Sequence, residues 1–330
     1  MAELRLDPWG TDYDAAYAVD SAAPEPVATV TVGVELPAGQ WRPLTADKAA
    51  TEPFETLVFI DGSRRMEARF HLEEGGALQA YGGLGTTAVG AVVVRAGQPA
   101  SFHPDLRLGR WCFIGGGRTH AGVVLEQQGS WHGRLAFDPV PVPASDPEAI
   151  MQELQNTMRS EEANLSSTLA ADLPDALIIC DGPLPRHDPG SLLGYIKTSS
   201  LQRLAGDELE VARSLQQGER TPIYKVATPG AAHFEWVLRL RDPSPWYYSL
   251  AGTVRLQLAA PLSDAELPDF VKRVADWSCT YLPAFSSQAH QDPRAPQQLL
   301  PVRALETELK RRMGNNLLLR RRIVREYFAR

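Results

Sequence analysis

Short apolar runs and alternating segments mark the expected strands. Residues 56–60 (TLVFI) and 176–180 (ALIIC) each form a short apolar run with β-branched members that leads directly into Asp-Gly. This pattern is typical of a buried strand that runs into a turn. Residues 192–198 predict a strand beside 176–180. Apolar and polar residues alternate over 233–241 and 253–260, which predicts two half-buried strands that pair with each other.

A helical period replaces these strand patterns in three other places. After Pro147, apolar residues recur every three, four or seven positions, which predicts a helix that ends before Pro174. Its apolar face consists of Met151, Leu154, Met158, Leu165 and Leu169. Ser263 and Glu266 form a capping box for a helix that should reach about Ser278. Pro301 begins another helix, and Gly314 is placed to stop it.

The region from residue 56 to residue 138 is rich in β-structure. Glycine-rich turns separate strand candidates at 90–94, 121–127 and 131–137, so we expect a run of antiparallel strands there. A helix before the strand at 176–180 indicates a mixed sheet. The expected fold is α/β: a mixed sheet core flanked by helices, with a β-rich insertion and a helical C-terminal region. Residues 1–50 are expected to be a loosely structured lead-in with one strand over 27–36.

Composition limits how the chain can meet nucleic acid. With 330 residues and 44% hydrophobic residues it can bury a large core, and its 33 basic and 40 acidic residues give a net charge of −7. Such a chain does not coat nucleic acid by charge alone, so any DNA contact must be local. Residues 303–330 reverse the balance with nine Lys or Arg. This basic tail either holds DNA phosphates or packs its apolar side in a dimer or partner surface while its arginines stay solvated, and the two are compatible.

The cysteines and the hydropathy pattern indicate where the protein works. Cys112, Cys180 and Cys279 are far apart in sequence and form no C-x-x-C pair, so neither a disulfide framework nor a zinc knuckle is expected. The first twenty residues carry acidic side chains and no apolar segment typical of a signal peptide, and no long uninterrupted apolar stretch occurs. We therefore expect a cytoplasmic protein that is neither exported nor inserted in a membrane.

Two aspartates at the ends of apolar runs are the strongest chemical signal. If the strands that end at Asp61 and Asp181 are neighbours, their carboxylates can converge on divalent cations, which prefer oxygen ligands. Such ions activate water for phosphodiester hydrolysis. The alternative is that Asp-Gly is only a turn dipeptide. Glu161 or Glu162 offers a third carboxylate, or both are solvated, and Lys197 could neutralise a phosphate or be an ordinary exposed lysine.

Other catalytic patterns are missing from the sequence. Residues 115–118 (GGGR) lack the spacing of a phosphate-binding loop and are expected to form a turn. Neither the H-E-x-x-H helix of zinc proteases nor the G-x-S-x-G turn of serine hydrolases occurs. Nucleotide binding by such a loop and hydrolysis by those routes have no support, which leaves carboxylate chemistry.

An ordered set of short motifs resembles the NurA nuclease family over roughly residues 57–305. The motifs are FIDGS at 59–63, RSEE at 159–162, ICDGPL at 179–184, GYIKTS at 194–199, PWYY at 245–248, YLP at 281–283 and Ala-His at 289–290. The resemblance implies a ribonuclease H-like core and manganese-dependent nuclease action on single- and double-stranded DNA, both as a 5′-to-3′ exonuclease and as a single-strand endonuclease. It also implies a homodimer that works with a HerA-type hexameric ATPase in DNA end resection and double-strand break repair.

The resemblance also assigns roles to residues of this chain. The implied catalytic set is Asp61, Glu162, Asp181, Lys197, Tyr281 and His290, of which Asp61, Glu162, Asp181 and His290 would hold one or two ions, Mn²⁺ or alternatively Mg²⁺. The basic residues expected to contact DNA are Lys310, Arg311, Arg312, Arg320, Arg321 and Arg322. The corresponding domain division is a lead-in over 1–50, a nuclease domain over 51–305 and a basic helical tail over 306–330.

Two other functions remain open from the sequence. A non-catalytic DNA-binding or scaffold subunit would bind DNA in a salt-sensitive way without cutting it. A hydrolase of small phosphate esters would turn over nucleotides but not polymers. Cleavage of linear DNA with Mn²⁺ separates both from a nuclease.

Overall fold

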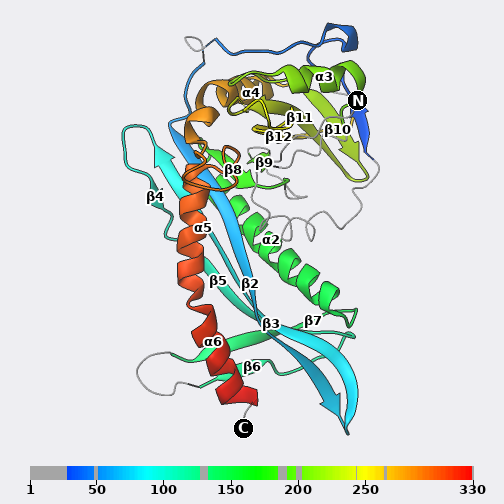
Figure 1. Ribbon diagram of the computed structural model, residues 1–330, viewed down its shortest axis with the longest axis vertical. Coiled ribbons are helices and arrows are strands. Elements are labelled where there is room, and N and C mark those ends of the chain that lie inside the picture. The colour runs from blue at the N-terminus through cyan, green and yellow to red at the C-terminus, as the bar shows by residue number, and fades with distance from the viewer. Residues whose placement is uncertain are drawn as a thin grey trace. The chain divides into compact units, whose positions relative to one another are not determined.

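The computed structural model describes residues 28–47, 51–126, 133–184, 192–197, 203–242, 244–263 and 266–328 (Figure 1). The chain divides into two compact units, each built from separate segments. Unit 1 comprises residues up to Phe59, Val93–Ser101 and Ser166–Arg303, and unit 2 comprises Ile60–Val92, Phe102–Leu165 and the residues from Ala304 onward. The division at residues 50 and 305 expected from the sequence stays a prediction. The two units are defined by compactness in space, and each combines separate segments of the chain, so they do not test it.

Unit 1 contains a mixed sheet. Its strands are β1 (Thr29–Thr31), β8 (Leu177–Asp181), β9 (Leu192–Ile196), β10 (Tyr224–Thr228), β11 (Ala231–Arg239) and β12 (Thr253–Ala260). Their order is β1-β10-β11-β12-β9-β8, followed by β2, whose residues up to Phe59 belong to this unit. β8 and β9 pair in parallel and the other pairs among the six strands are antiparallel. The predicted mixed sheet and the predicted pairing of β11 with β12 are confirmed.

Helices cover both faces of the sheet in unit 1. α3 (Gly206–Ser214) packs in a cluster that includes Ala212 and Val237. The neighbouring Trp236 donates a hydrogen bond from Nε1 to Oγ of Ser278 in α4 (Asp269–Tyr281), 3.1 Å away. Successive side chains of a strand point to opposite faces, so α3 and α4 lie on opposite sides of β11. Both helices are seen beside β10–β12 in Figure 1.

The start of α4 differs from the prediction. The capping box at Ser263 and Glu266 predicted a helix from there, but α4 begins at Asp269, and residues 264–265 lie outside the described residues. Pro268 has an extended conformation (φ −65°, ψ 144°) and precedes the helix. A proline also forces the residue before it out of the helical region, so a helix could not continue through Leu267.

Unit 2 is built on a long hairpin. β2 (Thr56–Glu74) and β3 (Ala77–Arg95) are joined at Gly75 and Gly76, which have positive φ values of 59° and 78°, as a tight two-residue turn requires. The expected end of the first strand at Ile60 was therefore wrong, because Asp61-Gly62-Ser63 continues the strand instead of forming a turn. Beyond the apolar run, more buried and more exposed residues alternate along the chain, as expected for a β-strand.

The remaining strands of unit 2 complete the order β2-β3-β5-β7-β6, with β4 (Ser101–Phe102) paired to β3. β5 (Arg107–Ile114) runs antiparallel to β3, and β6 (Val123–Leu125) runs antiparallel to β7 (Leu135–Pro141). β5 and β7 pair in parallel, contrary to the antiparallel run that the sequence predicted. β6 lies between β5 and β7 along the chain, and local periodicity does not reveal which of these strands pair.

Two long helices cover the hairpin of unit 2. α2 (Pro147–Asp172) contributes its residues up to Leu165, and Leu154 lies against Gly85. α5 (Leu300–Met313) contributes its residues from Ala304, and Leu305 lies against Gly90. Positions 85 and 90 differ by an odd number, so the two helices lie on opposite faces of β3.

The helix ends were largely predictable. α2 ends before Pro174 as predicted, and α5 stops before Gly314, whose φ of 84° favours glycine. α6 (Asn316–Ile323) and the π-helical turn Val324–Phe328 follow. Among the described residues, no helix is both long enough and apolar enough to cross a membrane.

Part of the expected lead-in is anchored by a buried ion pair. Nη1 and Nη2 of Arg220 each donate to the carboxylate of Glu35 at 2.8 Å, and Nη2 also donates to Asp276 of α4 at 2.9 Å. The backbone N–H of Ile223 donates to Glu35 at 2.7 Å. Burial alone would raise the pKa of Glu35, but the hydrogen bond and charge of Arg220 hold it below its ordinary value.

Replacing Glu35 by Gln should lower the free energy of unfolding of unit 1 by about 2–3 kcal/mol at pH 7, because Arg220 loses its main carboxylate. A carboxyl with a lowered pKa stabilises the fold above its unfolded pKa and loses that contribution as pH falls through the folded value. The difference between wild type and E35Q should therefore narrow below about pH 4.5. Denaturant titrations across this range measure it, with the exposed Glu52→Gln as a control. A constant difference down to pH 2 would contradict the assignment.

Candidate metal centre

Asp181 lies at the end of β8 and is held by a buried lysine. Its register partner on the parallel strand β9 is Tyr195, and Lys197 follows the end of β9. Nζ of Lys197 donates hydrogen bonds to Oδ2 of Asp181 and to Oε1 of Gln298. Lys197 is only 6% exposed, so it is not an ordinary surface lysine. The chain turns after Asp181 at Gly182, whose φ is 120°.

Gln297 and Gln298, in the residues just before α5, hold Lys197 in position. Besides the bond from Lys197 to Gln298, Nε2 of Gln297 donates to the backbone oxygens of Lys197 (3.2 Å) and Thr253 (3.0 Å). The Tyr195 hydroxyl donates to the backbone oxygen of Gln297 at 2.6 Å. Sequence analysis missed both glutamines, because they are far from β9 in the chain and belong to no motif. Their effect is to orient Lys197, and through it Asp181.

Asp61 is a buried carboxylate on β2, and Glu162 of α2 lies over the opposite face of this strand. Asp61 is 8% exposed, and its neighbour Gly62 lies against α2. A Cβ at Gly62 would lie 2.5 Å from Oε1 of Glu162 and 2.8 Å from Cγ of Met158. The side chain of Glu162 therefore lies directly over β2, whereas Glu161 lines a separate cavity. Of the two candidates from the sequence, Glu162 is the one that lies against β2, but on the face opposite to the Asp61 side chain.

The described residues contain one group of acidic side chains with the spacing of a metal site. One carboxylate oxygen from each of Asp61, Asp181 and Glu306 lies within 4.8 Å of the others. Both predicted aspartates belong to this group. Its third member is Glu306 of α5, which sequence analysis did not single out, in place of the predicted Glu162.

The two other predicted catalytic residues lie elsewhere. The hydroxyl of Tyr281, at the end of α4, donates to the backbone oxygen of Thr51 at 3.1 Å, and its ring stacks on Trp277. His290 is exposed in the segment between Phe285 and α5. Neither residue belongs to the acidic group described above. Their catalytic roles remain predictions from the resemblance alone.

Several basic residues of the C-terminal tail form ion pairs within unit 2. Arg311 and Arg312 both bind the carboxylate of Glu308, at 2.6 and 2.7 Å, and their hydrogen bonds lower the pKa of Glu308 to about 2. Nζ of Lys310 lies 3.7 Å from Oε2 of Glu306. Arg320 and Arg321 are exposed on α6. All five keep their side chains on the surface.

Arg322 is different from its neighbours. It is 6% exposed, pairs with Glu326 at 3.0 Å, and donates to the backbone oxygens of Gly133 and Glu126 at 2.9 Å. Leu319 and Ile323 of the same helix join the core of unit 2. Arg322 thus connects α6 to the β6–β7 region. Its burial fits the packed side of an amphipathic helix better than it fits a residue that contacts DNA.

Comparison with known proteins adds no family assignment. A scan against protein-family models finds no match, and no curated protein matches the chain.

Replacing Gly62 by Ala should destabilise unit 2 by about 1–3 kcal/mol, because the new methyl group would overlap Glu162 and Met158. The matched control is Gly33→Ala, where a Cβ meets nothing within 4 Å. Chemical denaturation of both variants measures the difference. If G62A proved as stable as G33A, Glu162 would not lie over β2 as described.

Proposed function

We propose that this protein is a divalent-metal-dependent deoxyribonuclease with a ribonuclease H-like core. The observation that carries the proposal is the proximity of Asp61, Asp181 and Glu306. The ordered motifs resembling the NurA family support the same activity. The mixed sheet with helices on both faces in unit 1 is compatible with the proposed core.

The donor set suits a hard divalent cation. All three side chains offer carboxylate oxygens, which Mn²⁺ and Mg²⁺ both accept. Two unit charges about 4 Å apart repel by about 4 kcal/mol at an effective dielectric constant of 20, so three carboxylates this close need compensating positive charge. Lys197 supplies one positive charge at Asp181, and a divalent cation would balance the rest.

The chain's own residues would position the reaction. Asp61, Asp181 and Glu306 would hold one or two cations, which supply activation of the attacking water and stabilisation of the leaving oxygen of a phosphodiester. Lys197 keeps Asp181 in one orientation and places a buried positive charge beside it. Glu162 lies on the face of β2 opposite to the Asp61 side chain, so we do not propose it as a metal ligand.

The wider biology rests on the resemblance. We propose single- and double-stranded DNA as substrates, Mn²⁺ or Mg²⁺ as the cofactor, a homodimer, and a separate HerA-type hexameric ATPase as the motor in DNA end resection. The chain's lack of a phosphate-binding loop supports a separate motor. The free buried cysteines agree with a reducing cytoplasm.

Replacing Asp61 or Asp181 by Asn should reduce Mn²⁺-dependent cleavage of labelled linear DNA by about 10²-fold or more, because each change removes a charged ligand. Asp175→Asn is the control, since this exposed residue lies in the turn before β8. Unchanged cleavage in D61N and D181N would refute the catalytic assignment. Salt-sensitive DNA binding by a wild type that cuts no DNA with any divalent metal would instead identify a non-catalytic DNA-binding subunit.

The third ligand can be tested separately. Glu306→Gln should reduce Mn²⁺-dependent cleavage at least tenfold, on the order of one lost charged contact, whereas Glu162→Gln should have a smaller effect. Initial rates over a range of Mn²⁺ concentrations compare the two variants, because a lost ligand raises the metal requirement. The reverse order of effects would return Glu162 to the ligand set and remove Glu306 from it.

A further inference from the structure

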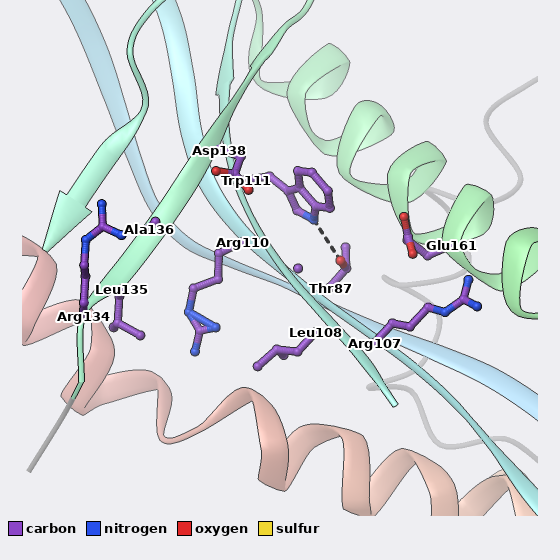
Figure 2. A pocket seen from close by; sticks show the side chains of 11 residues that line it. Thr87, Arg107, Leu108, Arg110, Trp111, Arg134, Leu135, Ala136, Asp138 and Glu161 are labelled. Atoms are coloured by element: carbon purple, nitrogen blue, oxygen red, sulfur yellow. Dashed lines mark hydrogen bonds between the residues drawn. The ribbon is translucent and has the colours of Figure 1, made fainter. Parts of the chain in front are cut away.

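Two neighbouring strands of unit 2 diverge and leave a cavity between them. β5 pairs with β3 along its whole length, from Arg107 to Ile114, but its register with β7 begins only at Trp111. The first residues of β7, Leu135 to Phe137, pair instead with β6 on their other side. A cavity of about 380 Å³ lies in this fork (Figure 2).

Residues from both faces of the sheet line the fork. Gly85 lies against α2 and pairs with Trp111, so Trp111 and Arg107 lie on the α2 side of β5. Arg110 is one residue from Trp111 and therefore lies on the opposite side, which α5 covers. Nε1 of Trp111 donates to Oγ1 of Thr87 at 2.9 Å, which fixes the indole as one wall (Figure 2). The cavity thus wraps the edge of β5.

Of the three arginines that line the fork, two form ion pairs. Arg107 pairs with Asp105 at 3.0 Å, and Arg134 lies 3.7 Å from Glu126. Deeper on the α5 side, Glu67 and Glu326 are also engaged, by Arg65 at 2.8 Å and by Arg322 at 3.0 Å. Among the described residues, Arg110 has no ion pair of this kind, and its buried Nε has no hydrogen-bond partner.

Charged groups of both signs surround Arg110. Burial lowers the pKa of its guanidinium, and the charges of Arg65 and Arg322 add to this effect, against the opposing charge of Glu67. A half-buried guanidinium with a buried, unused N–H near two other arginines is a site that an anion would stabilise.

We propose that the fork binds a phosphodiester group of a nucleic-acid strand, with Arg110 as its principal ligand. A guanidinium matches two phosphate oxygens, and a phosphodiester brings a single negative charge to the one lining arginine that stands outside the ion pairs above. Asp138 and Glu161 also line the cavity and disfavour a doubly charged terminal phosphate. The fork would fix a strand at a point that none of the sequence motifs indicated.

This inference rests on the proposed function only in taking DNA as the nucleic acid. Arg110 lies outside the proposed metal ligands, so it can be tested by binding without cleavage. The probe is a fluorescently labelled 20-nucleotide single strand in EDTA, with and without a 5′-phosphate, followed by anisotropy across a salt series. Inorganic phosphate serves as the competitor.

The Arg110→Gln variant should bind the unphosphorylated strand about tenfold more weakly, as expected for one charge-assisted contact. The slope of log K against log salt should become shallower by about 0.7, the value for one phosphate contact on a single strand. Arg110→Lys should keep the slope, since it keeps the charge. Arg69→Gln, an exposed arginine of β2 outside the cavity, is the matched control.

Several outcomes would overturn the inference. They are an R110Q variant that equals R69Q in affinity and slope, a loss seen only with the 5′-phosphorylated strand, and full displacement of the strand by millimolar inorganic phosphate at constant ionic strength. If R110Q failed to fold by thermal unfolding, the comparison of R110K with wild type would decide, and a slope lowered in R110K would overturn the proposal. A wild type that binds DNA through Arg110 but never cuts it would refute the proposed function and leave this inference standing.

Discussion

Concentrated negative charge is the constraint on which this account depends. Asp61, Asp181 and Glu306 bring carboxylate oxygens within 4.8 Å of one another, and Asp61 is itself buried. Like charges this close are costly without a cation. Lys197 supplies one compensating positive charge beside Asp181, and Gln297 and Gln298 hold this lysine in position. Side chains that would otherwise weaken the fold are thus kept close together, in the arrangement that we propose holds a divalent ion.

The two aspartates reach this arrangement by different local routes. Asp181 lies at the end of a short parallel strand, where Gly182 allows the chain to turn away. Asp61 lies within a strand that continues to Glu74. There Gly62 has another purpose, since its missing side chain lets Glu162 approach β2. The same Asp-Gly dipeptide therefore marks a turn in one place and a close contact in the other.

Local patterns predicted what depends on local physics. The helix after Pro147, the helix stopped by Gly314, and the strand leading to Asp181 all follow from periodicity and turn chemistry. The sequence did not reveal the length of β2 or the parallel pairing of β5 with β7, because both depend on distant partner strands.

The candidate site was predicted in the same uneven way. Asp61, Asp181 and Lys197 stand out because each lies at the end of an apolar run. Glu306 and Gln298 reach the site from a distant helix and the residues just before it, with no motif of their own. The basic tail looked uniform in sequence, yet Arg322 is buried while Arg320 and Arg321 are exposed, a distinction set by the helix face that packs on β6 and β7.

The most direct test of the central claim is an X-ray experiment on crystals soaked with Mn²⁺, with data collected for anomalous scattering. The account predicts an anomalous peak bounded by carboxylate oxygens of Asp61, Asp181 and Glu306, at the 2.0–2.2 Å or so typical of small divalent ions. An ordered crystal with no peak at these three residues, or with Mn²⁺ bound only elsewhere, would contradict it.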